Sequence, residues 1–267
     1  MPKIAGGNRY ERLIEEIFFG RWKRGMKDFE FAREELEEAA ENLKIKLPKN
    51  LGDVIYALRY RTPLPEAVAK TASPGLHWII EGAGRAKYRF RQTRASHVVP
   101  REDLAVIKIP DATPEILARY ALSDEQALLA KVRYNRLIDI FLGLTTYSLQ
   151  NHLRTSVKGI GQIEIDEIYV GLNRNGSQFV IPVQAKGGND KLSIVQTRQD
   201  IQCCLSRFPS LVCRAISAQF MANDTIALFE LAVVDDEIKV VDERHYRLVE
   251  ADSVSASDLE AYARRNR

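Results

Sequence analysis

The chain has 267 residues, 45% hydrophobic and 28% charged, which is enough for a substantial core in one large domain or two of ordinary size. It has no apolar run of about 18 residues, and its amino terminus lacks the apolar stretch of a secretion signal. The three cysteines, Cys203, Cys204 and Cys213, have no Cys-x-x-Cys spacing, which gives no support to a disulfide framework or a zinc knuckle. We therefore expect a soluble, cytoplasmic protein that does not associate with membranes.

The formal net charge of +3 is distributed unevenly along the chain. Residues 1–100 carry 19 Lys and Arg against 13 Asp and Glu, a balance of +6, whereas residues 101–267 carry 20 against 23, a balance of −3. Basic charge is therefore concentrated in the first 100 residues.

The first 100 residues predict three helices followed by a hairpin. The acidic run from residue 28 to 43 has the pattern of one amphipathic helix, and residues 51–60 and 65–70 predict two shorter helices. Strand-like runs at 77–81 and 87–91 flank a glycine-containing connection at 82–86. This order predicts a winged-helix-like DNA-binding domain over residues 1–100.

The second hairpin strand carries a row of cations. Arg85, Lys87, Arg89 and Arg91 recur at every second residue, so they share one face of the strand, and Arg94 extends the row. We expect these five side chains to contact the phosphates of a nucleic acid, because no acidic residue interrupts the row. The alternative is an ordinary solvated hairpin.

The rest of the chain predicts a mixture of helices and strands. We expect residues 101–122 to form a linker that contains a strand at 104–109 and a short helix after Pro114. One longer helix should run from Ser123 towards Gly143. Strands are predicted at 145–157, 161–172 and 178–186, then a helix at 192–205, then strands at 211–220, 225–234 and 237–241.

Polar side chains stand on two of these strands, where apolar neighbours should bury them. Glu164 and Asp166 share one face of their strand, and Gln184 and Lys186 share one face of theirs. Burial of a carboxylate or an ammonium costs several kcal/mol unless the group is paired or binds a metal. This pattern indicates a site that has a function.

Glu-Ile-Asp at 164–166, a strand that ends in Val-Gln-Ala-Lys at 183–186 and the helix that follows resemble the PD-(D/E)XK nuclease superfamily. The similarity is greatest to type II restriction-endonuclease-like members. It implies an α/β (α+β) nuclease domain over residues 123–267, with a restriction-endonuclease-like mixed β-sheet core flanked by helices. In this resemblance Asp166 is the acid of the second core strand, Gln184 stands at the second acidic position, Lys186 is the lysine, and Glu164 is the acid two residues before the aspartate. Ile165 stands where the family name has proline, and a Gln-x-Lys variant occurs among such nucleases.

The resemblance also implies the chemistry. Asp166 and Glu164 would bind Mg²⁺ (or Mn²⁺), which prefers oxygen ligands and keeps several waters. Lys186 would stabilise negative charge or orient the nucleophile, and the products would carry a 5′-phosphate and a 3′-hydroxyl. Gln196, on the following helix, would reach the nucleic acid.

Each of these residues also has a structural alternative. Asp166 and Lys186 are also suited to a salt bridge between neighbouring strands, and Gln196 to an exposed helix face. Glu125 suits either a further metal-site acid or a helix cap. Glu167, on the opposite face of its strand, is expected to be exposed, whereas Asn151, His152 and Arg154 are candidates for phosphate contact.

From these observations we expect a metal-dependent DNA endonuclease, a type II restriction enzyme of a restriction-modification system, that acts on double-stranded DNA as a homodimer. A DNA-repair or mobile-element nuclease with the same chemistry is the first alternative. The second is a catalytically inactive DNA-binding regulator with a nuclease fold, which Gln184 favours and which the presence of Asp166 and Lys186 opposes.

Overall fold

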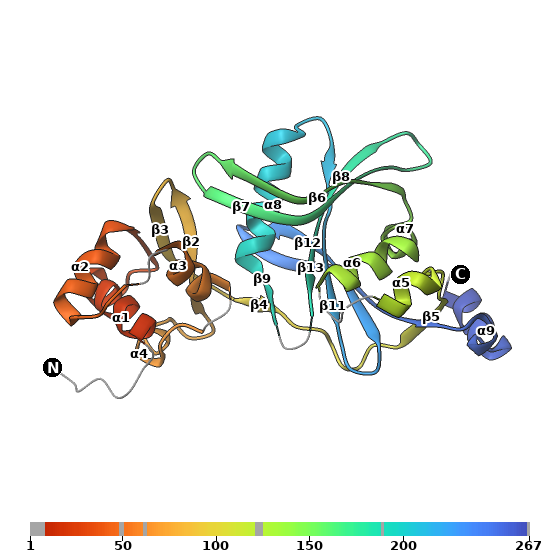
Figure 1. Ribbon diagram of the computed structural model, residues 1–267, viewed down its shortest axis with the longest axis horizontal. Helices are drawn as coiled ribbons and strands as arrows, with labels where there is room; N and C mark the ends of the chain where they lie inside the picture. Colours follow the sequence, from red (N-terminus) through yellow and green to blue (C-terminus); the bar gives the residue numbers. More distant parts are fainter. Residues whose placement is uncertain (1–8, 48–50, 61–62, 121–124, 188–189, 266–267) are drawn as a thin grey trace. The chain divides into compact units, whose positions relative to one another are not determined.

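The computed structural model describes residues 9–47, 51–60, 63–120, 125–187 and 190–265. The chain is mixed α/β and contains a large mixed sheet flanked by helices (Figure 1). Ser123, where we expected a helix to begin, lies outside the described residues. Within the described ranges, no helix is long and apolar enough to cross a membrane.

The chain forms two compact units. One comprises the chain up to His97 together with Arg154–Ile163 and Ser193–Gln199, and the other comprises Val98–Leu153, Glu164–Leu192 and the chain from Asp200 onward. Residues 106–110, inside the expected linker, form a strand of the large sheet in the second unit.

The first unit begins with helices around a small sheet. Its main elements are α1 (Arg9–Arg21), β1 (Asp28–Ala32), α2 (Glu34–Leu43), α3 (Leu51–Tyr60), α4 (Glu66–Ala69), β2 (His77–Gly84) and β3 (Lys87–Thr93). The strands form an antiparallel sheet in the order β1-β3-β2. The α3 helix has the bounds that its periodicity predicts.

The expectation of one helix over residues 28–43 is wrong, because its first five residues form β1. Phe29 and Phe31 lie two residues apart, which suits one face of a strand, and they pair with Phe90 and Tyr88 of β3. Phe31 is 2% exposed. The acidic residues that follow do form a helix, so the run contains two periodicities rather than one.

Aromatic side chains fill the core of this unit. The Phe18 ring lies 5.2 Å from the Trp78 ring, 5.1 Å from the Phe90 ring and 5.3 Å from the Phe29 ring, centroid to centroid. Such edge-to-face pairs stabilise the fold by about 0.5–1.5 kcal/mol each, in addition to the burial of the rings. Phe18 comes from α1, a helix that we did not predict, although its buried residues Leu13, Ile14, Ile17 and Phe18 have helical spacing.

The large sheet, most of which lies in the second unit, has the strand order β5-β13-β12-β11-β8-β7-β6 (Figure 1). Strand β10 pairs with β8. Its strands are β5 (Val106–Pro110), β6 (Thr145–Val157), β7 (Gly161–Leu172), β8 (Gln178–Lys186), β10 (Val212–Cys213), β11 (Ala215–Phe220), β12 (Thr225–Val234) and β13 (Glu237–Val249). The bounds predicted for β6, β7, β8 and β12 are confirmed, whereas β13 is longer than predicted. The remaining elements are β4 (His97–Val98), β9 (Leu192–Ser193), α5 (Glu115–Tyr120), α6 (Glu125–Tyr134), α7 (Leu137–Leu142), α8 (Ile194–Arg207), η1 (Ala251–Ser253) and α9 (Ala256–Arg265).

The single helix expected before β6 is two helices, α6 and α7. Arg136 has a left-handed backbone (φ 50°), which interrupts the helix between them. The adjacent Asn135 is 5% exposed, and its side chain accepts a hydrogen bond from the Ala112 N–H and donates one to the Thr113 hydroxyl. The break therefore places a buried amide that anchors the turn before α5.

The two faces of β8 differ in chemistry. Ile181, Val183 and Ala185 belong to an apolar core that includes Leu128 and Leu129 of α6. Because strand side chains alternate, Gln184 and Lys186 point to the opposite face. The apolar face thus fixes the side of the sheet on which the polar groups lie.

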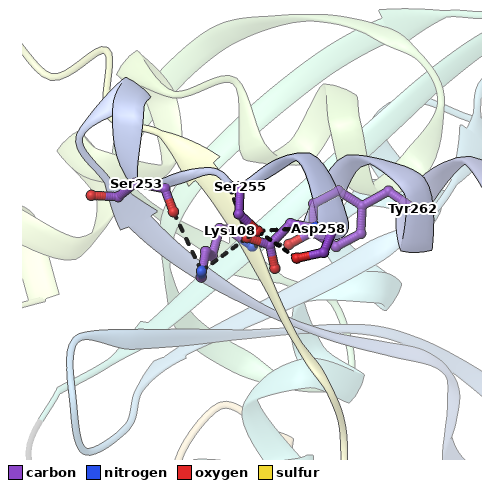
Figure 2. Close-up of polar contacts among 6 residues, drawn as sticks. Lys108, Ser253, Ser255, Asp258 and Tyr262 are labelled. Carbon is purple, nitrogen blue, oxygen red and sulfur yellow. Dashed lines mark hydrogen bonds and ion pairs between the residues drawn. The ribbon is translucent and has the colours of Figure 1, made fainter.

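The β5 edge of the sheet is covered by the C-terminal helix. The Lys108 N–H donates to the Tyr262 hydroxyl at 2.9 Å, and the Lys108 ammonium donates to the Asp258 carboxylate at 2.9 Å and to the Ser253 carbonyl at 3.3 Å (Figure 2). An uncovered edge strand invites pairing with another chain. These contacts place η1 and α9 across that edge.

The Asp258 carboxyl is held in its ionised form. Hydrogen bonds from the Ser255 hydroxyl, from Lys108 and from the Ser255 N–H lower its pKa to about 2, from an ordinary value of 3.8. We expect Ser255→Ala, which removes the first cause, to raise the pKa of Asp258 towards 3.8, and Lys108→Met to raise it as well. NMR titration of the carboxyl carbon measures this pKa, with Arg264→Met as a control that should leave it unchanged.

Because the pKa of Asp258 is lowered in the folded state, the ionised carboxylate stabilises the folded protein above pH 3.8. This stabilisation is lost as the pH falls towards 2. An Asp258 that titrates near 3.8 in the unaltered protein would show that α9 does not hold the β5 edge.

Candidate active site

The candidate site lies where β7 and β8 separate. The two strands pair from Leu172 opposite Gln178 as far as Glu167 opposite Val183. Beyond that point the Ala185 N–H donates to the Asp166 carboxylate at 2.9 Å, while β8 continues to pair with β11. The Asp166 carboxylate therefore replaces a main-chain carbonyl as the acceptor for the Ala185 N–H. This hydrogen bond places the carboxylate between the two strands.

Burial is the largest influence on the pKa of Asp166. Loss of solvent raises the pKa of this carboxyl, while the Ala185 N–H and the Lys186 ammonium lower it and the carboxylates of Glu125 and Glu164 raise it. The balance is a raised pKa. Two other residues expected at the site, Lys186 and Glu164, thus lie within electrostatic range of Asp166.

Lys186 is held by an acid from the preceding helix. Its ammonium lies 2.7 Å from the Glu125 carboxylate, and its side chain is 13% exposed. Glu125 stands in the first turn of α6 and is 36% exposed. The carboxylate that we considered as a metal ligand or a helix cap therefore faces the lysine.

The Gln184 amide is buried without a partner. The residue is 2% exposed, and neither its Oε1 nor its Nε2 atom has a hydrogen bond in the part of the chain that the structure describes. The same holds for the hydroxyl of Ser217, which stands opposite Gln184 on β11. An unsatisfied buried polar group costs about 1–3 kcal/mol, so these atoms indicate a ligand-binding role.

Glu164 lies nearer to solvent. Its side chain is 39% exposed, and its Oε1 atom lies 3.4 Å from Nδ1 of His152. It shares a strand face with Asp166, two residues away. This position suits a residue at the mouth of the site.

Asp200 of α8 is a member of the site that we did not predict. It is 3% exposed, and its Oδ1 atom has no hydrogen bond among the described residues. Burial raises its pKa well above the ordinary value, Asp166 and Cys213 raise it further, and Lys186 lowers it. Asp200 lies three and four residues before the buried Cys203 and Cys204, and this helical spacing is the signal that identifies it as buried.

The donor atoms fit a divalent cation. In the described part of the chain, no three His, Cys, Asp or Glu side chains form a cluster able to hold a metal. The Asp166 carboxylate and the unpaired Gln184 carbonyl oxygen are nevertheless hard oxygen donors, the type that Mg²⁺ prefers. Mg²⁺ commonly takes only one or two carboxylates from the protein and completes its shell with water and phosphate. Asp166, Gln184 and Glu164 are the residues that would hold it.

Comparison with known proteins returns no match. No family model, no curated protein and no solved structure matches the chain.

The opposite face of β7 holds a second polar cluster. Glu167, which we expected to be exposed, is fully buried, and Nε of Arg133 donates to its carboxylate at 2.9 Å. The Ser148 hydroxyl also donates to Glu167, and the Asn151 amide lies between Glu167 (3.2 Å) and Arg133 (3.1 Å). The expectation for Glu167 is wrong because a pairing cation from α6 offsets the cost of its burial. Asn151 therefore contacts this cluster through its side-chain amide.

The basic row on β3 has acidic neighbours on both sides. Arg89 lies 2.7 Å from Glu30 of β1 and 4.0 Å from Glu81 of β2, and Arg91 lies 4.0 Å from Glu81. Along its own strand the row is uninterrupted, but the sheet register supplies acids from the adjacent strands. Arg85 is in the two-residue turn between β2 and β3 and not on the strand.

The other predicted nucleic-acid-binding residues differ in exposure. Arg85, Lys87 and Arg94 are exposed. Gln196 lies on α8 and is half-buried. The exposed charges of the row thus belong to Arg85, Lys87 and Arg94, while Arg89 and Arg91 are neutralised in part.

We expect Asp200→Asn to reduce the pH dependence of stability. A carboxyl whose pKa is raised in the folded state stabilises the protein below its unfolded pKa of 3.8, and this contribution is lost as the pH rises through the folded pKa. The difference in the free energy of unfolding, variant minus unaltered protein, should therefore be more positive at pH 8 than at pH 4. Urea denaturation at the two pH values measures this, with the exposed Asp224→Asn as a control. Equal pH dependence in both proteins would contradict the assignment.

Proposed function

We propose that the protein is a metal-dependent endonuclease that hydrolyses phosphodiester bonds of double-stranded DNA, and that it acts as a type II restriction enzyme. The observation that carries this proposal is the Asp166 carboxylate at the separation of β7 and β8, beside the unpaired Gln184 amide and the Lys186 ammonium. These are the residue types that bind a cation and stabilise a developing negative charge.

The order of elements around the site supports the proposal. Helices α6 and α7 are followed by the neighbouring strands β6, β7 and β8, then by α8, and then by β11, which runs parallel to β8. A helix, three strands, a helix and a further strand is the order that the resemblance to restriction-endonuclease-like nucleases implies. The acids and the lysine stand on the second and third of these strands.

Each residue has a role in the proposed reaction. Asp166, Gln184 and Glu164 would hold the Mg²⁺ or Mn²⁺ ion, which would polarise the scissile phosphate and lower the pKa of a water. Lys186 stabilises negative charge on the phosphate oxygens or orients the attacking water. Glu125 holds the Lys186 side chain, which has four flexible carbons, so that its ammonium stays at the site.

The first unit supplies the proposed DNA-binding module. Its order of helix, strand, two principal helices and hairpin, with the sheet order β1-β3-β2, supports a winged-helix-like fold. Arg85 and Lys87 at the hairpin end, together with Arg94, are the exposed cations proposed to contact DNA phosphates. Arg89, Arg91 and Gln196 are proposed as secondary contacts. A homodimer would bring one active site to each DNA strand.

We expect Asp166→Ala and Lys186→Ala each to lower the rate of plasmid cleavage in Mg²⁺ by roughly a hundredfold or more. DNA binding, measured in Ca²⁺ or without metal, should remain. Gln184→Glu adds a charged oxygen ligand and should lower the Mg²⁺ concentration that gives half-maximal cutting, whereas Gln184→Ala should raise it. The exposed Gln178→Ala on the same strand is the matched control.

The pattern of DNA fragments separates the possible roles. Discrete fragments support a restriction enzyme, and general degradation supports a repair or mobile-element nuclease. Intact DNA at every Mg²⁺ and Mn²⁺ concentration would contradict catalysis and favour a DNA-binding regulator. Cleavage that survives both alanine substitutions would show that the site lies elsewhere.

We expect the double substitution Arg85→Ala and Lys87→Ala to weaken duplex DNA binding and to flatten its dependence on salt. Each lost phosphate contact should reduce the slope of log affinity against log salt by about one. Fluorescence anisotropy at several salt concentrations measures both quantities, with Lys239→Ala on β13 as the control. An unchanged slope would remove this hairpin from the DNA-binding surface.

A further inference from the structure

Strand β6 lies at the other edge of the large sheet and is exposed. In the described part of the chain it pairs with β7 alone. Tyr147 is 59% exposed and Leu149 is 51% exposed. An exposed edge strand with apolar side chains is a template for pairing with another chain.

Up to Arg154, the composition of β6 is that of an interior strand. No Asp, Glu, Lys or Arg occurs between Asp139 and Arg154, in a chain that is 28% charged. Comparable uncharged stretches, between Arg174 and Lys186 and between Arg214 and Asp224, form β8 and β11, which have neighbours on both sides and are largely buried. Uncharged residues at an edge lack the charges that normally prevent edge pairing.

The two edges of the large sheet differ in what covers them. At β5 the Lys108 N–H is covered by Tyr262 of α9 (Figure 2). At β6 we define the neutral edge segment as residues 147–151. It is bounded by the Thr146 N–H, which donates to Asp139, and by His152, whose left-handed backbone (φ 48°) interrupts the regular strand. Ser148 and Asn151 fasten this segment to Glu167, so the edge is held in place before any partner arrives.

We propose that the neutral edge segment is an interface between two copies of this chain, which pair antiparallel about a two-fold axis at Leu149 and join their sheets. In this arrangement Tyr147 lies opposite Asn151 of the partner, and Leu149 lies opposite its own copy. The segment is its own complement, as a two-fold interface requires. A strongly charged partner strand would find no opposite charge in this segment, whereas a second copy meets no like charge and adds apolar contact. The interface does not depend on nuclease activity, although it supplies the homodimer that the proposed function requires.

The test is the mass of the full chain in solution, without DNA or metal. We expect sedimentation and light scattering to show a dimer that dissociates on dilution within about 1–100 µM. Leu149→Lys brings two like charges face to face and should raise the dissociation constant by roughly tenfold or more. Val241→Lys makes the same change at a residue of similar exposure, 57%, on β13 and outside the neutral edge segment, and should remain dimeric.

A mixture of Leu149→Lys and Leu149→Glu chains should restore a dimer with one chain of each kind, because opposite charges then meet at the axis. Circular dichroism shows whether the variants fold; if Leu149→Lys does not, Leu149→Cys decides, since it should form an intermolecular disulfide that the unaltered chain does not form under the same oxidation. A monomeric unaltered chain, or a Leu149→Lys chain that stays as dimeric as Val241→Lys, would overturn the proposal. Because the readout is mass, a dimer without cleavage would refute the proposed function alone.

Discussion

The hydrogen bond from the Ala185 N–H to the Asp166 carboxylate is the contact on which the candidate site depends. It replaces a rung of the β7–β8 ladder with a side chain, so the strands separate while β8 remains paired with β11. The unpaired N–H of a buried strand needs an acceptor, and a carboxylate between the strands supplies one. The same bond aims Asp166 towards the face that Gln184 and Lys186 share.

The burial of polar groups around this contact opposes folding. The Asp166 and Asp200 carboxyls have raised pKa values because they have lost solvent, and the Gln184 amide and the Ser217 hydroxyl have no hydrogen bonds among the described residues. A protein retains such groups where activity needs them, at the expense of stability. The Glu167 cluster on the other face of β7 is different, because Arg133, Ser148 and Asn151 all contact Oε1 of its carboxylate, although Oε2 has no hydrogen bond among the described residues. Two buried acids in adjacent positions of one strand therefore have different partners.

The expectations that failed share one cause, which is that a neighbouring strand or helix supplied a partner. The basic row on β3 is uninterrupted along its own strand, yet Glu30 and Glu81 stand beside Arg89 in the sheet register. Glu167 is buried because α6 brings Arg133 to it. The acidic run after residue 28 divides into β1 and α2 because Phe29 and Phe31 pair with β3. Periodicity within one segment carries no information about which residues another segment places opposite it.

The sequence by itself determined the strands β6, β7 and β8 to the residue and the shared strand faces of Glu164 with Asp166 and of Gln184 with Lys186, because side-chain alternation and turn residues are local properties. Only the tertiary structure decided that β7 and β8 separate at Asp166, that Glu125 holds Lys186, and that Asp200 of α8 lies within electrostatic range of Asp166. It also decided which sheet edge α9 covers and which edge remains exposed. These features join residues between 19 and 154 positions apart, and a contact over such a separation is set by the packing of whole elements and not by the residues beside it in the chain.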